Sequence, residues 1–305
     1  FKISSSISIF LNFRIIFFNL LVLFSVAEGL IKFLIALSNG SHVYLDHVVQ
    51  QIEYDNEKVS VKCLVNGTRE VVFNGDCVLC TLPLGVLKRS VRNRNNAPSF
   101  QPELPSWKIN AINSLGFGNV NKIMLFFEKP FWENTRVFGQ ISDTMCATSR
   151  GEMFMFQAHR DKPILIALVS GDSANALEEA PNNIIVYKIM NFLSAVFGPA
   201  CPKEPTDVII TRWRADRFSC GAFSYVSSNC TLDAYDNLAA PVKDLAGFDR
   251  IFFAGEHTCR EYPGTIHGAY LSGLREAGHI ADLILGIPYS ATIDPKKMTP
   301  SSEKT

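Results

Sequence analysis

The sequence predicts a mixed α/β (α+β) fold, and three patterns lead to this class. Residues 251–254 form an uninterrupted apolar run, as in a central strand covered on both faces, and a long helix rich in small residues follows them. Short apolar segments separated by polar turns predict several strands between residues 43 and 82. A third group of strands, with one long amphipathic helix, lies between residues 122 and 226.

The first part of the chain is predicted to contain a helix over residues 28–40, followed by short strands. The apolar side of this helix would consist of Leu30, Phe33, Leu34 and Leu37, and Gly40 would end it. Strands are then expected over residues 43–52, 59–65, 70–73 and 77–82. The proline-bearing residues 98–105 are expected to link this region to the second one.

The second region is predicted to be a mostly antiparallel sheet with helices, which is typical of a substrate domain. Its strands are expected over residues 122–128, 154–158, 164–170, 208–214 and 222–226. A helix over residues 184–197 would have an apolar face made of Ile185, Ile189, Phe192, Leu193 and Val196.

The stretch after residue 250 carries the strongest functional signal. Gly255 lets the backbone pass close to a ligand, and Glu256 follows at the carboxyl end of the strand, where open α/β sheets bind ligands. Thr265 is expected to cap the next helix, whose N-terminus would point into the same crevice. This arrangement suits a large polar cofactor, because the carboxylate can accept hydrogen bonds from sugar or ribityl hydroxyl groups.

The helix after Thr265 has one face of very small side chains: Ala269, Gly273, Ala277 and Ala281. Glycine inside a helix costs roughly 0.5–1 kcal/mol relative to alanine, so Gly268 and Gly273 need a close neighbour. Close approach to the sheet or to a flat cofactor would explain both. Gly286 and Pro288 are expected to end the helix.

Composition limits the classes of partner. The 305 residues have a formal net charge of zero, so no global basic field favours nucleic acid. Eight cysteines in a chain of this length do not form a disulfide framework, and Cys77 and Cys80 are expected to be core thiols on a buried strand. His257, Cys259 and His267 lie inside the cofactor motif, so no metal site is expected there.

Residues 1–27 form an unassigned apolar segment. Residues 15–26 are strongly apolar, and Arg14 before them and Ala27 after them imitate a signal peptide. The run is short for a transmembrane span, so foreign, mis-spliced or buried sequence is weighed against an N-terminal membrane anchor. Residues 289–305 are expected to form a polar tail.

Four blocks of sequence point to a known family. They are residues 77–88 (CVLCTLPLGVLK), 115–132 (LGFGNVNKIMLFFEKPFW), 211–226 (TRWRADRFSCGAFSYV) and 250–286. In order and spacing, these blocks resemble the flavin-dependent amine oxidase superfamily, and within it most closely the lysine-specific histone demethylases. The resemblance covers about residues 28–286.

The resemblance implies the C-terminal part of a FAD-binding Rossmann-like domain (residues 28–118 and 232–288) with an inserted substrate-binding domain (residues 119–231) built on a mostly antiparallel sheet. The Gly-x-Gly-x-x-Gly motif that binds the FAD pyrophosphate in this superfamily does not occur in the sequence. The long helical insertion that binds the corepressor scaffold is also absent. The chain is therefore expected to be the C-terminal part of an enzyme.

The resemblance also implies roles for particular residues. Lys122 would hold a water at the flavin N5 edge and assist reoxidation by oxygen, since a partly desolvated ammonium stabilises developing negative charge. The FAD contacts would come from Val49, Thr81, Leu82, Trp213, Gly255, Glu256, Thr265 and Ile266. The substrate pocket would be formed by Trp213, Phe218, Phe223, Tyr225 and Thr265. From pattern alone, Lys122 fits a surface lysine, and the aromatic residues fit an aromatic core equally well.

The sequence departs from the demethylase pattern at three of these positions. Phe223 and Phe218 stand where tyrosine and tryptophan are usual, and Gly264 replaces a more common alanine. These changes put the choice of substrate in doubt. The candidates for receiving a basic peptide are Asp172, Glu178, Glu179 and Asp216.

The expected function is FAD-dependent oxidative demethylation of a methylated lysine in a histone tail, by hydride transfer to the flavin with release of formaldehyde and peroxide. The alternatives are a polyamine or monoamine oxidase and a catalytically inactive fragment that binds no FAD. The resemblance implies the nucleus as location, a histone tail as substrate and, for a full-length protein, a corepressor scaffold as partner.

Overall fold

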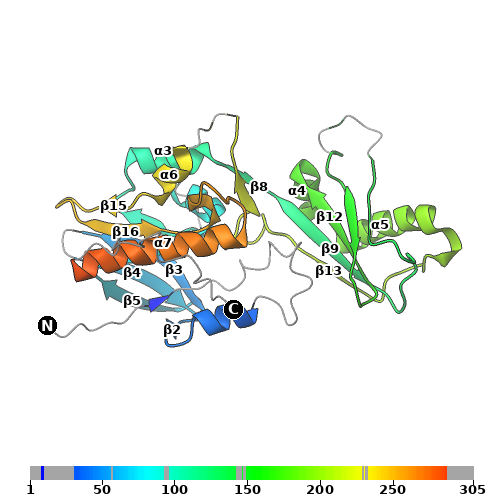
Figure 1. The fold of residues 1–305 in the computed structure, drawn as a ribbon, viewed down its shortest axis with the longest axis horizontal. Coiled ribbons are helices and arrows are strands. Elements are labelled where there is room, and N and C mark those ends of the chain that lie inside the picture. The colour runs from blue at the N-terminus through cyan, green and yellow to red at the C-terminus, as the bar shows by residue number, and fades with distance from the viewer. Residues whose placement is uncertain are drawn as a thin grey trace, which may run out of the picture.

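The computed structural model describes residues 8–9, 31–55, 58–92, 96–141, 146, 149–228, 230 and 233–286. It confirms the mixed α/β fold, with two lobes side by side along the long axis of the molecule (Figure 1). Each lobe has its own hydrophobic core. The unassigned segment and the polar tail lie outside the described residues, apart from the two-residue strand β1 (Ser8–Ile9), which pairs with β2 (His42–Val43).

The first lobe contains a four-stranded sheet. In spatial order its strands are β5 (Arg69–Gly75), β4 (Val59–Val65), β3 (His47–Tyr54) and β7 (Ser99–Gln101). Every second residue of β4 is buried, as the strand prediction required. Strand β7 corrects the interpretation of residues 98–105 as a link, because Phe100 is buried in this lobe and β7 pairs in parallel with β3.

A three-stranded sheet in the same lobe carries the predicted cofactor motif. Its order is β15 (Val242–Lys243), β16 (Asp249–Phe253) and β6 (Val78–Cys80). Ile251, Phe252 and Phe253 are buried, which confirms the strand predicted from the apolar run. Because β16 and β6 are parallel, their carboxyl ends meet at one edge of the sheet. There β16 continues into the 3-10 helix η3 (Glu256–Thr258).

In the described part of this lobe the α-helices are α1 (Ile31–Leu37), α2 (Leu84–Ser90), α3 (Ser106–Ser114), α6 (Asp233–Ala239) and α7 (Ile266–Leu285). Helix α1 lies within the predicted helix over residues 28–40. Leu37, the last residue of this short helix, is 49% exposed, which corrects its predicted burial.

A buried lysine joins α3 to α6. Lys108 donates hydrogen bonds from Nζ to the backbone oxygens of Asn237 (2.9 Å), Leu238 (2.8 Å) and Ala240 (2.5 Å). These carbonyls form the negative end of the α6 dipole and would otherwise lack donors. The same Nζ lies 4.0 Å from the centre of the Phe253 ring. Burial lowers the pKa of Lys108 to about 7. The lysine thus fixes the end of α6 beside the end of β16.

The second lobe is a five-stranded sheet in which all neighbours are antiparallel, as predicted. Its order is β10 (Val137–Phe138), β11 (Met155–Ala158), β12 (Ile164–Ser170), β9 (Val120–Phe126) and β13 (Asp207–Ile210). Two helices, α4 (Gly171–Glu179) and α5 (Asn182–Phe197), and the short 3-10 helix η2 (Gly198–Ala200) complete it.

Helix α5 packs on this sheet through Ile185, Ile189 and Leu193. Their spacing of four residues continues to Phe197, which packs on the same core, and this corrects the predicted burial of Val196, which is 51% exposed. Of the helices in the described ranges, the stretch Asn182–Ala200 alone is long and apolar enough to cross a membrane. Its buried stripe is that of a helix on a protein core.

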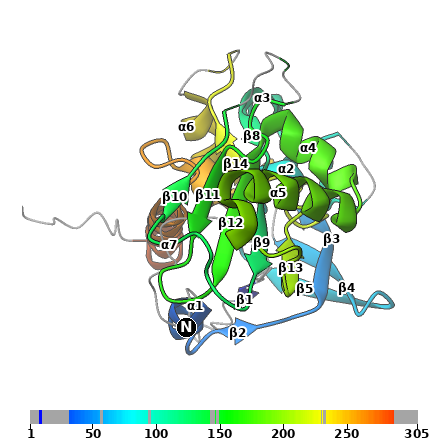
Figure 2. The same ribbon diagram turned by 90° about the vertical axis from the view of Figure 1, so that its right-hand side faces the viewer.

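A two-stranded ribbon lies between the lobes. Strand β8 (Gly116–Gly118) pairs antiparallel with β14 (Phe223–Tyr225), so that Gly118 faces Phe223 and Gly116 faces Tyr225. The chain enters the second lobe after β8 and returns just before β14, so both crossings run close together (Figures 1 and 2). The domain boundaries at residues 118 and 231 stay a prediction.

Candidate functional site

The carboxyl ends of β6 and β16 form the edge at which the sequence predicted a cofactor. The backbone N–H of Ala254 donates to the Cys80 oxygen at 3.1 Å, which aligns the two strand ends. Gly255 then turns sharply with a φ of +139°, and a Cβ at this position would lie 2.5 Å from the His257 ring. Glycine is therefore required here, as predicted. Thr81, which follows β6, is exposed at the same edge.

The Glu256 carboxylate joins three segments of the chain. It accepts hydrogen bonds from the Ser224 backbone N–H (3.0 Å), the Ser224 hydroxyl (2.6 Å) and the Gly264 backbone N–H (2.7 Å). Burial raises the pKa of this carboxyl group, although these donors act against that effect. Glu256 thus ties η3 to strand β14 and to the turn before α7. The predicted contact of Glu256 with a ligand hydroxyl group stays a prediction beside this structural role.

Helix α7 begins as predicted. The Thr265 hydroxyl accepts a hydrogen bond from the Gly268 N–H at 3.0 Å and donates one to the Tyr262 oxygen at 2.8 Å. The N–H groups of Ile266 and His267 lie in the first turn, where no intrahelical acceptor exists and the dipole is positive. Gly286 ends the helix in the left-handed conformation, which confirms the predicted stop.

The face of α7 that packs against the lobe differs from the predicted one. Gly268, Ser272 and Glu276 are buried, whereas Ala277 on the small-residue face is exposed. A Cβ at Gly268 would overlap the Tyr262 oxygen, which confirms a packing reason for this glycine. Gly273 has no neighbouring atom within 4 Å of a Cβ among the described residues, so its predicted close neighbour is not found there.

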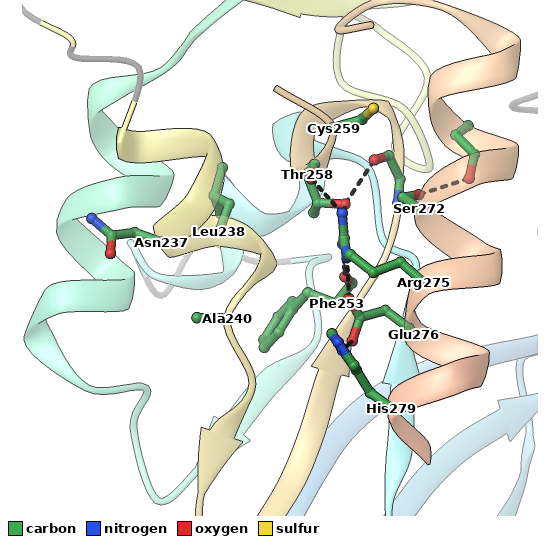
Figure 3. Close-up of polar contacts among 12 residues, drawn as sticks. Asn237, Leu238, Ala240, Phe253, Thr258, Cys259, Ser272, Arg275, Glu276 and His279 are labelled. Atoms are coloured by element: carbon green, nitrogen blue, oxygen red, sulfur yellow. Dashed lines mark hydrogen bonds and ion pairs between the residues drawn. The ribbon is translucent and has the colours of Figure 1, made fainter. Parts of the chain in front are cut away.

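A polar cluster that the sequence analysis missed holds α7 against the end of β16 (Figure 3). The Arg275 guanidinium donates to the backbone oxygens of Thr258 (2.8 Å) and Phe253 (3.2 Å) and to Oε1 of Glu276 (2.5 Å). Glu276 is fully buried and also contacts His279 Nδ1 at 3.2 Å. The signal in the sequence is the adjacent charged pair Arg275-Glu276 in the middle of a helix whose residues are mostly small or apolar.

Ser272 adds a further link between strand end and helix. Its hydroxyl accepts a hydrogen bond from the Gly255 N–H at 2.8 Å and donates one to the Ala269 oxygen at 2.7 Å. The turn at Gly255 is therefore held at a fixed distance from the first turns of α7. Both parts of the predicted cofactor motif are thus rigidly connected.

Lys122 lies on β9 and is 5% exposed, which corrects its interpretation as a surface lysine. Burial lowers the pKa of its ammonium to about 8. Its backbone N–H donates to Thr211 Oγ1 at 2.8 Å. The side-chain oxygen of the neighbouring Asn121 accepts from the Trp213 N–H at 3.2 Å. These contacts bring the chain segments of Lys122 and Trp213 together.

Glu178 is the centre of a second buried network. Its carboxylate accepts hydrogen bonds from the side chains of Asn119 and Asn121, both at 2.7 Å, and from the backbone N–H groups of Arg214 (3.1 Å) and Ala215 (2.7 Å). This network explains why the strand predicted over residues 208–214 ends at residue 210. The same hydrogen bonds occupy the Glu178 carboxylate, which the sequence analysis named as a candidate to bind a basic peptide.

The other acidic candidates differ in their surroundings. Asp172 and Glu179 are exposed on α4, whereas an oxygen of Asp216 accepts the Phe218 N–H at 2.9 Å. Among the residues that the structure describes, no three His, Cys, Asp or Glu side chains converge as a metal site would require.

The predicted aromatic residues fall into two groups. Phe223 and Tyr225 share one face of β14, with Phe223 against Gly264 and Tyr225 over Gly116. Trp213 and Phe218 lie in the preceding loop and are half-buried. The Trp213 oxygen accepts hydrogen bonds from the Ser219 hydroxyl (2.8 Å) and the Gly221 N–H (3.0 Å), which closes this loop just before β14.

Val49 and Leu82 are half-buried and pack against the core of the first lobe. Packing against this core therefore accounts for both side chains without a ligand. Their predicted contacts with FAD stay predictions, as do those of Thr81 and Ile266.

The fold and this site define a class of protein, and comparison with known proteins identifies the family. Residues 4–281 match the model of the flavin containing amine oxidoreductase family. The chain therefore belongs to this family, which confirms the predicted superfamily and its flavin class of cofactor. The match begins at residue 4, so it includes the apolar segment that the motifs did not connect to the family.

The chain is similar to proteins named as histone demethylases. It is 44% identical over 266 residues to a possible lysine-specific histone demethylase 1 of Drosophila melanogaster, and the match covers 83% of this chain and 30% of that protein. It is 36% identical over 278 residues to lysine-specific histone demethylase 1 homolog 1 of Arabidopsis thaliana, covering 89% of this chain and 31% of the relative. The chain thus spans about a third of the length of these relatives.

A solved structure supports the fold. A redesigned putrescine oxidase superposes with a TM-score of 0.64 over 83% of this chain and 52% of that one, at 19% identity. At this identity the comparison shows a shared amine oxidase architecture and nothing about substrate.

Proposed function

We propose that the protein to which this chain belongs carries out FAD-dependent oxidative demethylation of a methylated lysine in a histone tail. The observation that carries the proposal is the buried Lys122, which lies beside the Trp213 segment and has a pKa lowered to about 8. The names of the relatives, which are 36–44% identical, favour a histone tail as substrate. The nucleus and a corepressor scaffold are part of the same proposal.

The described residues fit one part of a FAD molecule. The sharp turn at Gly255, the exposed Thr81 at the same sheet edge and the N–H groups in the first turn of α7 would form a polar cradle for its flavin side. The sequence has no Gly-x-Gly-x-x-Gly motif for the pyrophosphate. When bound, FAD supplies the two-electron acceptor for oxidation of the substrate C–N bond.

The residues of this chain would position and desolvate the reactants. The half-buried Trp213 and the aromatic face of β14 would exclude water and hold a methylammonium group. The N-terminus of α7 would stabilise negative charge placed against it. Lys122 would hold its proton on Nζ below about pH 8 and stabilise negative charge that develops on oxygen.

The first experiment is the visible spectrum of the purified chain after incubation with FAD and desalting. Retained flavin absorbance would support cofactor binding, and assays with a methyl-lysine histone peptide and with putrescine would then separate the demethylase from a small-amine oxidase. A colourless protein would contradict FAD binding by this chain and favour the inactive fragment.

Lys122 gives a pH test in the flavin-loaded enzyme. Because its ammonium loses its proton as the pH rises through about 8, oxygen consumption should fall across this range. Lys122→Met should lower the rate of oxygen consumption at pH 7, and the fall in that rate near pH 8 should disappear. Lys129→Met changes an exposed lysine beyond the end of β9 and should leave the profile unchanged. An identical pH profile in Lys122→Met would contradict the proposed role.

The small-amine oxidase is kept as a second candidate because of Glu178. Its carboxylate is saturated by four protein donors, so it is not available to a basic histone peptide. Faster oxidation of putrescine or spermidine than of the peptide would decide in favour of this candidate.

A further inference from the structure

A basic pocket lies outside the residues assigned to flavin and amine. It has a volume of about 260 Å³ and lies between α2 and the loop that follows Trp213. Its lining includes Gly85, Lys88, Arg89, Arg92, Phe117 and Arg214. Four of these six residues are cationic, and no acidic side chain among the described residues lines the pocket. The chain as a whole has no net charge, so this is a local concentration of positive charge.

The cations of α2 are held by neutral acceptors. Lys88 donates to the Asn113 backbone oxygen at 3.0 Å, and Arg92 donates to the side-chain oxygen of the same residue at 3.3 Å. Arg89 donates to the Cys220 sulfur at 3.4 Å. Within the described part of the chain, neither these three cations nor Arg214 forms an ion pair with a carboxylate. Among the described residues, no carboxylate therefore lies within ion-pair distance of these charges.

The surroundings of Lys88 lower the pKa of its ammonium. Burial, with a further contribution from the neighbouring Arg92, lowers the pKa of Lys88 to about 8. An anion in the pocket would relieve this repulsion, because it would place a negative charge between the cations.

The walls of the pocket are rigidly packed. A Cβ at Gly85 would lie 2.6 Å from both the Phe117 ring and the Ser219 oxygen, so α2 and the loop are in close contact at this point. The Phe117 ring lines the pocket beside the cations. A ring of this kind is a surface on which a flat heterocycle can stack.

We propose that this pocket binds the phosphate group of a small phosphorylated compound. Arginine presents a planar set of donors that matches phosphate oxygens, and three arginines and a lysine converge here on one cavity. The volume suits one small molecule. A nucleic acid would instead need an extended basic face, which a chain with no net charge does not favour.

The test uses the full chain and isothermal titration with three probes: inorganic phosphate, pyrophosphate and adenosine monophosphate. Binding of at least one probe is expected. Arg92→Gln and Arg214→Gln change exposed residues and should each weaken binding about 10-fold or more, since a charge-assisted hydrogen bond contributes about 1.5–3 kcal/mol. Arg160→Gln, an exposed arginine of the second lobe, is the matched control and should bind as the unchanged chain does.

The outcomes separate this proposal from the proposed enzyme activity, because the readout requires neither FAD nor an amine. Tighter binding of adenosine monophosphate than of phosphate would indicate that the heterocycle of the ligand contacts the Phe117 ring. Absence of binding by all three probes, or equal weakening by Arg160→Gln, would overturn the proposal. Displacement of bound FAD by pyrophosphate would also overturn it, since the pocket would then be part of the cofactor site. Retention of the far-ultraviolet circular dichroism spectrum shows that each variant is folded.

Discussion

The ring of Tyr225 lies directly over Gly116, its partner in the ribbon formed by β14 and β8. A Cβ added at Gly116 would overlap the Tyr225 ring, whereas one at Gly118 would lie 3.7 Å from its nearest neighbours. Glycine at position 116 therefore makes room for an aromatic residue that is itself 49% exposed. The ring covers the backbone at Gly116 and helps to set the register of the ribbon between the two lobes.

Gly116→Ala should destabilise the protein by about 1–3 kcal/mol, because the added methyl group displaces the Tyr225 ring. Urea unfolding measures the change. Gly118→Ala is the matched control in the same strand and should have a smaller effect. In a Tyr225→Ala background the cost of Gly116→Ala should largely disappear; a cost that persists there would show that the ring is not its cause.

Glu256→Gln should lower the free energy of unfolding by about 1–3 kcal/mol, since the amide nitrogen would face the N–H donors of Ser224 and Gly264 and leave one of them without an acceptor. Thermal unfolding with Glu179→Gln as an exposed control measures this. Amide exchange at Ser224 and Gly264 should accelerate together. Unchanged exchange at both positions would argue against the three-way link.

Lys108 should make stability depend on pH. Its pKa is about 7 in the folded protein and 10.5 is the ordinary value, so between these values the unfolded chain binds more protons. The contribution of Lys108 is therefore least favourable below pH 7 and improves as the pH rises. From pH 7 to 9 the gain should be about 2 kcal/mol relative to Lys108→Met, at about 1.4 kcal/mol per pKa unit. If the free energy of unfolding changed with pH in the same way in the unchanged protein and in Lys108→Met, the lowered pKa of Lys108 would be contradicted.

Lys108→Met itself should destabilise the protein by about 3 kcal/mol or more at neutral pH, because three carbonyl oxygens at the end of α6 lose their donor. Chemical denaturation measures this loss. Lys162→Met, which changes an exposed lysine, serves as the control. A change below about 0.5 kcal/mol would show that water replaces the ammonium.

The sequence predicted those elements in which a hydrophobic pattern is uninterrupted. The buried strands β4, β12 and β16 and the helices α5 and α7 were located to within a few residues, because each buries a regular stripe or face. Gly255 and Thr265 were also predicted correctly, since a sharp turn and a helix cap each require particular residue types.

Other elements were missed for physical reasons. Helices α2, α3 and α6 are only seven to nine residues long, and much of what fixes them lies far away in sequence. Lys108 is an example, because its three acceptors lie about 130 residues later. The hydrogen bonds that Glu178 and Glu256 accept from the protein have the same character: residue type shows that a carboxylate is present, but only the fold shows which donors surround it.

The networks around Asn121 and Glu178 have a consequence for motion. The chain passes between the lobes along two neighbouring segments, and side-chain hydrogen bonds connect the second of them, at Trp213, Arg214 and Ala215, to the start of β9 and to α4. These hydrogen bonds hold the returning segment firmly against the second lobe. Because Asn121 and Glu178 both belong to the second lobe, a change in the angle between the lobes would have to take place in the returning chain between Ala215 and β14 rather than at residues 213–215.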